Sequence, residues 1–347
     1  MTQLASVQDR TIPVSIIPLG DHVTCWLLEP KQPPLFIAPK DGNFGSIRDV
    51  VEWARQHLSV LDELILEHGG IVLRGFPIGT TEEFGKFADC FPAYHDSYQG
   101  GAAARRQLQG RVYEATQRSG PQRIGIHQEM FYMRDYPRRI AFFARKVAEK
   151  GGETIIADMR ALSRKIPDTL RSELEKKGIR NVRNFAAPNG KTVETEHMDR
   201  RGWDFAFYTD SREEVEDVCK RRGLEPFWHS DGSLTVFNKV DAFETHPVTG
   251  ENIYRSGLHG GKFYRDAKPD SIAEQVRRSQ KFPSGVYLGD GSELVPADEV
   301  LLERLVNECT IVWPWQVGDV MILDNLQVGH GRNPFEGERA TEVAMFD

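Results

Sequence analysis

The stretch TIVWPWQVGDVMILDN, residues 310–325, decides the fold. β-Branched and aromatic residues fill both halves of it, and a turn at Gly318 separates them, so we predict two strands here. The opposite end of the chain, residues 12–28, is also rich in strand-forming residues, and the apolar run Ile71–Leu73 predicts a further buried strand. Strands at both ends of one chain favour a β-sandwich or barrel core over a parallel α/β sheet.

Helices are predicted between these strand regions. The apolar spacing after Ser46 predicts one long helix that ends at the Gly69-Gly70 pair, and Thr81 begins a shorter helix. A polar loop that carries His330 is expected after the last strong strand. Further amphipathic helices are predicted at residues 159–177, 211–222, 272–282 and 297–309, with β-like pieces at 233–237, 285–288 and 341–345.

No internal repeat or linker-like segment divides the chain. We therefore expect one domain, residues 1–347, that is mainly β with helical insertions within roughly 155–310. The formal net charge of −7 argues against a nucleic-acid-binding role, which needs a basic face. The four cysteines form no CxxC pair, which predicts free thiols in a reducing compartment. Because neither a signal-peptide pattern nor a membrane-length apolar run is present, we expect a cytoplasmic protein.

Three His-x-Asp/Glu pairs could supply two ligands of a metal site. Residues two apart on a strand point to the same side, and a non-haem iron(II) oxygenase needs two imidazoles and one carboxylate on one face of the metal. The pairs are His127/Glu129, His197/Asp199 and His229/Asp231. Spacing favours none of them. Asp231 precedes a glycine, which predicts a turn, and His197/Asp199 lie in a polar, charged segment that predicts a loop. Only His127/Glu129 is flanked by apolar residues on both sides. Two ionisable groups in such a setting are costly unless they are paired or bind a metal.

The third ligand would be a histidine farther along the chain. His246 precedes a proline in a turn, and His259 lies in a glycine-rich loop, whereas His330 follows the strongest C-terminal strand signal. Arg339 comes shortly after it. A planar guanidinium suits the distal carboxylate of 2-oxoglutarate, because it can form a bidentate pair.

With these residues in place, the chain resembles the taurine dioxygenase-like (TauD/TfdA) iron(II)/2-oxoglutarate enzymes, especially the branch similar to the syringomycin-pathway hydroxylase. The resemblance covers most of the chain and rests on the order and spacing of five blocks. They are GGIVLRGFP at 69–77, IGIHQEMFY at 124–132, GGETIIADMR at 151–160, THPVTGENIY at 245–254 and GDVMILDNLQVGHGRNPFEGER at 318–339.

The resemblance implies a double-stranded β-helix (jelly-roll) core and a set of site residues. It implies that His127, Glu129 and His330 bind Fe(II), and that Arg339 and Thr154 contact the distal carboxylate of 2-oxoglutarate, with dioxygen as the second co-substrate. Glu129 matches the syringomycin-type and clavaminate-synthase-like branch. Halogenases of the family have a small residue there, so Glu129 argues against halogenation.

The implied activity is that of a 2-oxoglutarate-dependent dioxygenase, an oxidoreductase of secondary metabolism. Its substrate would be an amino-acid-like small molecule, free or tethered to a carrier protein, and hydroxylation is the expected outcome. Desaturation, epoxidation or cyclisation needs only a differently placed substrate. Candidates for contacting a polar head group are Arg105, Arg106, Gln128 and Arg255.

Two other classes stay open at this point, as does the oligomeric state. A zinc hydrolase could use the same three ligands, but the chain has no HExxH motif. A non-catalytic jelly-roll binding module would not require the three ligands together with Thr154 and Arg339.

Overall fold

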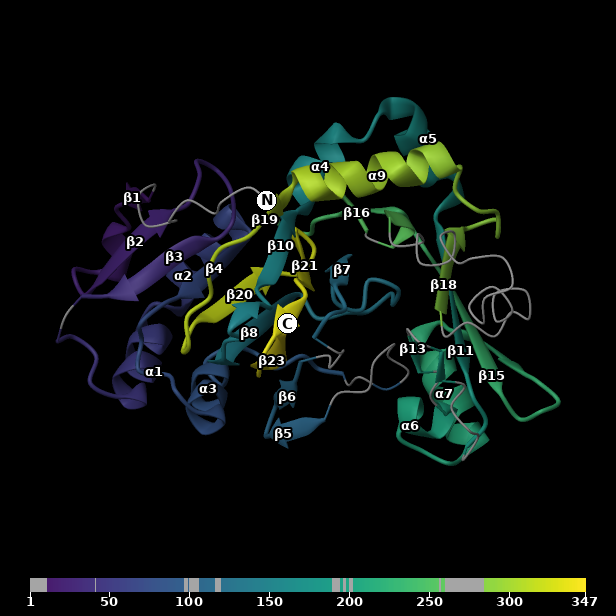
Figure 1. Cartoon of the computed structure of the whole chain (residues 1–347), viewed down its shortest axis with the longest axis horizontal. Coiled ribbons are helices and arrows are strands. Elements are labelled where there is room, and N and C mark those ends of the chain that lie inside the picture. The colour runs from purple at the N-terminus through teal and green to yellow at the C-terminus, as the bar shows by residue number, and fades with distance from the viewer. Residues whose placement is uncertain are drawn as a thin grey trace.

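Two β-sheets stack face to face in the computed structural model of the chain (Figure 1). The structure describes residues 11–40, 42–96, 99, 106–115, 120–188, 194–195, 198–199, 202–255, 257–259 and 284–347. The larger sheet has nine strands in the order β1-β2-β3-β4-β20-β8-β23-β6-β5. Their bounds in that order are Ile12–Val14, Val23–Leu27, Leu35–Pro39, Gly70–Leu73, Val320–Asp324, Arg139–Lys146, Ala340–Phe346, Val112–Glu114 and Gln107–Gln109. The smaller sheet has the order β19-β10-β21-β7, with bounds Thr310–Ile311, Thr154–Asp158, Val328–Arg332 and Ile124–His127.

Alternating side chains explain how the larger sheet is buried on both faces. In β20, Val320 and Ile322 belong to the cluster that the N-terminal helices cover, whereas Met321 and Leu323 belong to the cluster between the two sheets. Successive residues of a strand point to opposite faces, so a fully apolar strand must be covered on both sides. The helices on the outer face are α1 (Ile47–Gln56), α2 (Leu58–His68) and α3 (Thr81–Ala88), and a short 3₁₀ turn, η2, spans Ile17–Leu19. The predicted jelly-roll core is confirmed, as are the two strands predicted within residues 310–325.

Two predicted helices are each divided in the structure. The helix expected from Ser46 to Gly69 breaks at His57, whose backbone (φ −111°, ψ 17°) leaves the helical region and whose ring Nδ1 donates to the Trp53 carbonyl at 2.7 Å. The helix expected at 159–177 becomes α4 (Met159–Lys165) and α5 (Asp168–Lys177). Pro167 lies between them, and a proline disfavours helical backbone in the residue before it.

The insertion between the core strands contains a sheet of its own. Its strands lie in the order β14-β15-β11-β18, with bounds Glu225–Trp228, Leu234–Val240, Ile179–Phe185 and Ser284–Leu288. Figure 1 shows this sheet at the right with α6 (Trp203–Phe207) and α7 (Arg212–Arg222) beside it, while α9 (Pro296–Glu308) runs along the top with α4 and α5. The β-like pieces predicted at 233–237 and 285–288 are confirmed, but the sequence did not reveal β11, which lies between β15 and β18. The helix predicted at 272–282 lies outside the described residues.

Three strand pairs complete the described elements. They are β12 (Glu194–Thr195) with β13 (Met198–Asp199), β16 (Phe243–Thr245) with β17 (Asn252–Tyr254), and β9 (Lys150–Gly151) with β22 (Phe335–Glu336). All four cysteines are buried free thiols, as predicted. Among the described residues, no helix combines the length and the apolar character of a membrane span. That residues 1–347 form a single domain stays a prediction.

The contact between β4 and β20 predicts a stability effect at Gly70. A Cβ placed on Gly70 would lie 2.6 Å from Leu323 Cδ2 and 2.8 Å from the Ile322 carbonyl oxygen. We expect Gly70→Ala to lower the free energy of unfolding by about 1–3 kcal/mol, because β4 and β20 must separate to admit the methyl group. Urea unfolding followed by far-UV circular dichroism measures this.

The control is Gly45→Ala, whose added Cβ meets its nearest neighbour, Asp49 Oδ2, at 3.6 Å. Equal unfolding free energies for the two variants would contradict the close approach of β4 and β20.

Candidate metal centre

Two paired strands place two of the predicted ligands opposite each other. β7 and β21 are antiparallel, and His127 is the register partner of His330. Paired residues of antiparallel strands project from the same face, and the two imidazole centroids lie 4.4 Å apart. His330 therefore lies in a strand, not in the polar loop that the sequence predicted. Its neighbours Gly329 and Gly331 obscured the strand pattern, because glycine has low strand propensity.

Those glycines permit the close approach of β7 and β21. A Cβ on Gly331 would lie 2.6 Å from the Ile124 carbonyl oxygen, and one on Gly329 would lie 2.8 Å from Ile126 Cγ2. Any larger residue would push the strands apart. The distance between the two imidazoles thus depends on the absence of side chains on either side of His330.

Glu129 completes the group. Its Oε2 lies 3.6 Å from His330 Nε2, and one ligand atom from each of His127, Glu129 and His330 lies within 4.8 Å of the others. Glu129 and His330 are buried, and His127 is partly exposed. Two imidazoles and one carboxylate on one side of a common point form the donor set of non-haem iron(II) oxygenases, so these residues fit the metal.

Hydrogen bonding leaves the correct nitrogen of His127 available for a metal. Its Nδ1 lies 2.9 Å from the Gly125 carbonyl oxygen, which can only accept, so Nδ1 carries the proton. The lone pair is therefore on Nε2. A hydrogen bond from a ligand's second ring nitrogen to a carbonyl is the usual way in which proteins fix an imidazole on a metal. The other histidine, His330, is held by packing, because the Phe142 ring covers one side of its imidazole at 4.8 Å between centroids.

Asn325 holds the backbone of the carboxylate ligand from both sides. The Glu129 N–H donates to Asn325 Oδ1 at 2.7 Å, and Asn325 Nδ2 donates to the Glu129 carbonyl at 3.0 Å and to the Pro137 carbonyl at 2.7 Å. Asn325 is fully buried. The next residue, Met130, has a left-handed backbone (φ 55°), which is uncommon outside glycine and turns the chain directly after the ligand. Asn325 therefore fixes where this turn begins.

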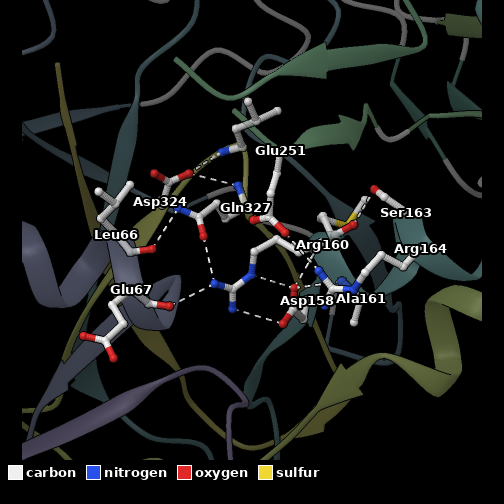
Figure 2. Close-up of polar contacts among 12 residues, drawn as sticks. Leu66, Glu67, Asp158, Arg160, Ala161, Ser163, Arg164, Glu251, Asp324 and Gln327 are labelled. Atoms are coloured by element: carbon white, nitrogen blue, oxygen red, sulfur yellow. Dashed lines mark hydrogen bonds and ion pairs between the residues drawn. The ribbon is translucent and has the colours of Figure 1, made fainter. Parts of the chain in front are cut away.

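The rest of the turn between β20 and β21 is tied to several parts of the fold. Asp324 accepts from the backbone N–H groups of Leu326 and Gln327 and from His246 Nε2 at 3.0 Å. Figure 2 shows that Gln327 in turn accepts from Arg160, whose guanidinium also binds both carboxylate oxygens of Asp158. His246, which the sequence placed in a turn, is thus a buried structural histidine.

Sequence reasoning missed Asp324, Asn325 and Gln327 as supports of the site. The sequence shows only that the apolar run VMIL is followed by DNLQ, and the structure shows that these polar residues are buried as well. Buried polar side chains need partners, so such a run marks a network.

The structure also brings together the two residues expected to contact 2-oxoglutarate. Arg339 Nη2 donates to Thr154 Oγ1 at 3.0 Å, and its Nε donates to the Gly152 carbonyl at 2.7 Å. Burial, with a smaller contribution from nearby Arg332, lowers the pKa of Arg339 to about 10. Thr154 lies two residues before Ile156 on β10, and Ile156 is the register partner of His330. Thr154 is therefore about 7 Å along the strand direction from the position of His330.

The other predicted residues lie elsewhere or have partners of their own. His229 and Asp231 form the expected turn, in which Asp231 accepts from the Ser233 N–H at 3.0 Å. His259 is buried and donates to the Ile126 carbonyl. Asp199 lies in the short strand β13, where the sequence predicted a loop, and His197 lies outside the described residues.

The four substrate candidates stay predictions. Arg105 lies outside the described residues, and Arg106 is an exposed residue paired with Glu114 at 3.2 Å. Gln128 donates to the Leu326 carbonyl at 2.7 Å, while Arg255 pairs with Glu244 at 2.8 Å and donates to two backbone carbonyls. The contacts of these three described residues are those of groups that support the fold.

Comparisons with known proteins agree with this geometry. The model of the "Taurine catabolism dioxygenase TauD, TfdA family" matches residues 36–345. The chain is 31% identical over 292 residues to the dapdiamide synthesis protein DdaC of Enterobacter agglomerans, covering 83% of this chain and 84% of that protein. It is 30% identical over 292 residues to a clavaminate synthase-like protein of Arabidopsis thaliana, covering 82% and 83%. The crystal structure of AAD-2 in complex with Mn(II) and N-oxalylglycine has a similar fold, with a TM-score of 0.51, 15% identity, and coverage of 93% and 96%.

The contacts of Asn325 predict an effect on metal affinity. We expect Asn325→Ala to weaken Fe(II) binding about 10- to 100-fold, because groups that orient a metal ligand have effects of that size. It should also lower stability by about 2–4 kcal/mol, since the Glu129 N–H and two carbonyls lose their buried partner. Anaerobic Fe(II) titration and urea unfolding measure the two effects.

Asn252→Ala is the matched control, since Asn252 is an exposed asparagine on β17. An Asn325→Ala variant that binds Fe(II) as tightly as this control would show that the Asn325 contacts do not position Glu129.

Proposed function

The chain belongs to the TauD, TfdA family of iron(II)- and 2-oxoglutarate-dependent dioxygenases, and from that premise we propose that it hydroxylates an amino-acid-like small molecule in natural-product biosynthesis. The predicted enzyme class and cofactors are confirmed at the level of the family, so the zinc hydrolase and the binding module are set aside. The observation that carries the proposal is the convergence of His127, Glu129 and His330 from two paired strands and the turn beyond them.

Each side chain of the site has a proposed task. His127 Nε2, His330 Nε2 and a Glu129 oxygen would hold Fe(II), and Asn325 would keep the Glu129 backbone in place. When bound, iron(II) supplies the chemistry that couples oxidation of the substrate to conversion of 2-oxoglutarate and dioxygen into succinate and carbon dioxide. The protein's own contribution is to orient the reactants and exclude water.

Arg339 and Thr154 would bind the distal carboxylate of 2-oxoglutarate. Their level in the sheet, about 7 Å from that of His330, suits a five-carbon dicarboxylate whose other end reaches the metal. In the described residues Arg339 has neutral partners, the Thr154 hydroxyl and the Gly152 carbonyl, and no carboxylate within ion-pair distance. Its positive charge is therefore available to an incoming anion.

The substrate class rests on the relatives. The dapdiamide synthesis protein DdaC carries a natural-product pathway in its name, which supports a role of this kind here. We further propose that the substrate is free or presented on a carrier protein, that the enzyme is cytoplasmic, and that it acts on no nucleic acid or membrane. Desaturation, epoxidation and cyclisation remain alternatives to hydroxylation, because the metal ligands are the same for all of them.

The first prediction from the proposed function concerns the metal ligands. Anaerobic addition of Fe(II) and then 2-oxoglutarate should give the visible charge-transfer absorption of an iron–2-oxo acid chelate. His330→Ala should abolish the absorption and weaken Fe(II) binding more than about 100-fold, because a ligand rather than one of its supports is removed. His22→Ala, which removes an exposed histidine, should leave both unchanged. A chelate absorption of full intensity in His330→Ala would contradict the ligand assignment.

The second prediction concerns the dicarboxylate. We expect Arg339→Met to raise the Kd for 2-oxoglutarate about 10- to 100-fold, since a charge-assisted hydrogen-bonded pair is lost. Fe(II) affinity should not change. Arg304→Met, on the exposed side of α9, is the control. If 2-oxoglutarate binds Arg339→Met and Arg304→Met equally well, its distal carboxylate is bound elsewhere.

The third prediction concerns the reaction itself. Incubation of the iron-loaded enzyme with 2-oxoglutarate, oxygen and a panel of amino acids, free or loaded on carrier proteins, should release succinate above the background in at least one case. Mass spectrometry of that product should show one added oxygen atom. A product lighter by two hydrogens would instead favour desaturation or cyclisation, and a panel without any stimulation would count against an amino-acid-like substrate.

A further inference from the structure

The inner face of the inserted sheet carries polar side chains between two apolar ends. Along β11 the buried residues are Ile179, Asn181, Arg183 and Phe185, and the two outer ones belong to separate apolar clusters. Asn238 of β15 is the register partner of Asn181, and it is buried as well. We call Asn181, Arg183 and Asn238 the polar strip.

Arg183 has a buried charge with no carboxylate partner among the described residues. Its exposed fraction is 4%, and neither Nη1 nor Nη2 has a hydrogen-bond acceptor among the described residues. Its guanidinium lies over the Tyr132 ring, 4.6 Å from the centroid. Of its ionisable neighbours, Tyr132 raises the pKa of Arg183, though by less than burial lowers it. Arg222 is a second cation that is itself paired with Asp96 at 2.7 Å. Cys219 is a neutral thiol, because burial raises its pKa to about 11. Burial without a compensating carboxylate lowers the pKa of Arg183 as well.

Two amide atoms of the strip lack partners among the described residues, a donor on Asn181 and an acceptor on Asn238. Asn181 Nδ2 is also buried without an acceptor among the described residues, and it lies two residues from Arg183 on the same face, about 7 Å along the strand. The Nδ2 of Asn238 donates to the Tyr132 carbonyl, whereas its Oδ1 is buried without a donor among the described residues. Buried donors without acceptors are costly, and a cation more so, unless a ligand satisfies them. A carboxylate has two acceptor oxygens, which could accept from Arg183 and Asn181.

The strip borders the segment that carries the metal ligands. Tyr132, which contacts both Arg183 and Asn238, is three residues beyond Glu129, so at most about 10–11 Å separates their Cα atoms. A small molecule that reaches the metal could therefore also reach the strip. By contrast, Arg106 and Arg255, two cations that the sequence suggested for this task, are each paired with a carboxylate of the protein.

We propose that the polar strip binds a carboxylate group of the substrate, with Arg183 as its cation and Asn181 as a second donor. This inference rests on the proposed function, because it assigns the substrate of that same metal centre to the acidic small molecules. Asn238 is a positioning residue, since its amide holds the Tyr132 backbone on which the guanidinium packs.

The test is a carboxylate titration of the protein loaded anaerobically with Fe(II) and 2-oxoglutarate, so that Arg339 is occupied. The probes are butyrate and its uncharged analogue butanamide, at constant ionic strength, with isothermal titration calorimetry as the readout. Butyrate should bind the wild type saturably and Arg183→Met at least about tenfold more weakly, since the charge-assisted contact is lost. Butanamide should not bind. Arg180→Met is the matched control, because Arg180 lies on the opposite face of the same strand, over the Phe237 ring.

Thermal unfolding separates this role from a structural one. Removing an unpartnered buried charge should leave the Tm of Arg183→Met equal to or above that of the wild type, whereas an arginine that supports the fold would lower it. Asn181→Leu provides a second variant if Arg183→Met does not fold, and it should also weaken butyrate binding.

Unchanged butyrate affinity in Arg183→Met would overturn the proposal, and the same holds for Asn181→Leu where that variant is needed. Equal binding of butyrate and butanamide, or no saturable butyrate binding in the wild type, would also overturn it. The chelate absorption is recorded in the same samples. Its absence refutes the proposed function, whereas its presence with unaltered butyrate binding refutes only the polar strip.

Discussion

The close antiparallel contact between β7 and β21 is the constraint on which the site depends. His127 and His330 face each other only because the two strands pair in this register, and the strands approach closely only because Gly329 and Gly331 have no side chains. A shift of one residue would turn every side chain of β21 to the opposite face and remove His330 from the site. The pairing has its own support, because β21 is also bonded to β10 along five register pairs, from Thr154 with Arg332 to Asp158 with Val328.

The buried turn from Asp324 to Gln327 connects this contact to the remainder of the molecule. Asp324 reaches the insertion through His246, and Asn325 holds the backbone of Glu129. Gln327 reaches helix α2 through the Leu66 carbonyl, and it reaches Asp158 of β10 through Arg160 (Figure 2). Each of these groups is buried and has its partners, so disturbing one leaves another unsatisfied in a water-poor interior. The turn is therefore a rigid element, and rigid support suits a centre that must hold three ligands at fixed distances.

Much of this arrangement could be predicted from local sequence. The apolar alternation of residues 310–325 predicted strands of the core, and the apolar surroundings of His127 and Glu129 distinguished them from two pairs of equal spacing. What could not be predicted depends on contacts between distant residues. The strand that contains His330 has glycines where a strand pattern needs branched residues, and its conformation follows from pairing with β7 and β10. Likewise, Arg183 reads as one more charged residue in the sequence IRNVRNF, and only the alternation of β11 against β15 shows that it points into the protein.

The arginines around the centre differ in their partners, and that difference separates cations that are paired with a carboxylate from cations that are not. Arg160 binds Asp158 through two hydrogen bonds, and Arg255 binds Glu244 and two carbonyls, so the charge of each is compensated within the protein. Arg339 and Arg183 are different. In the described residues neither has a carboxylate partner, and burial lowers the pKa of both. Two buried cations that lack a carboxylate partner among the described residues are costly, and bound anions would offset that cost. Since Arg339 contacts Thr154 and Arg183 packs on Tyr132, the two cations lie on different elements, and one anion would not satisfy both. Two separate anionic groups, one from the co-substrate and one from the substrate, would do so.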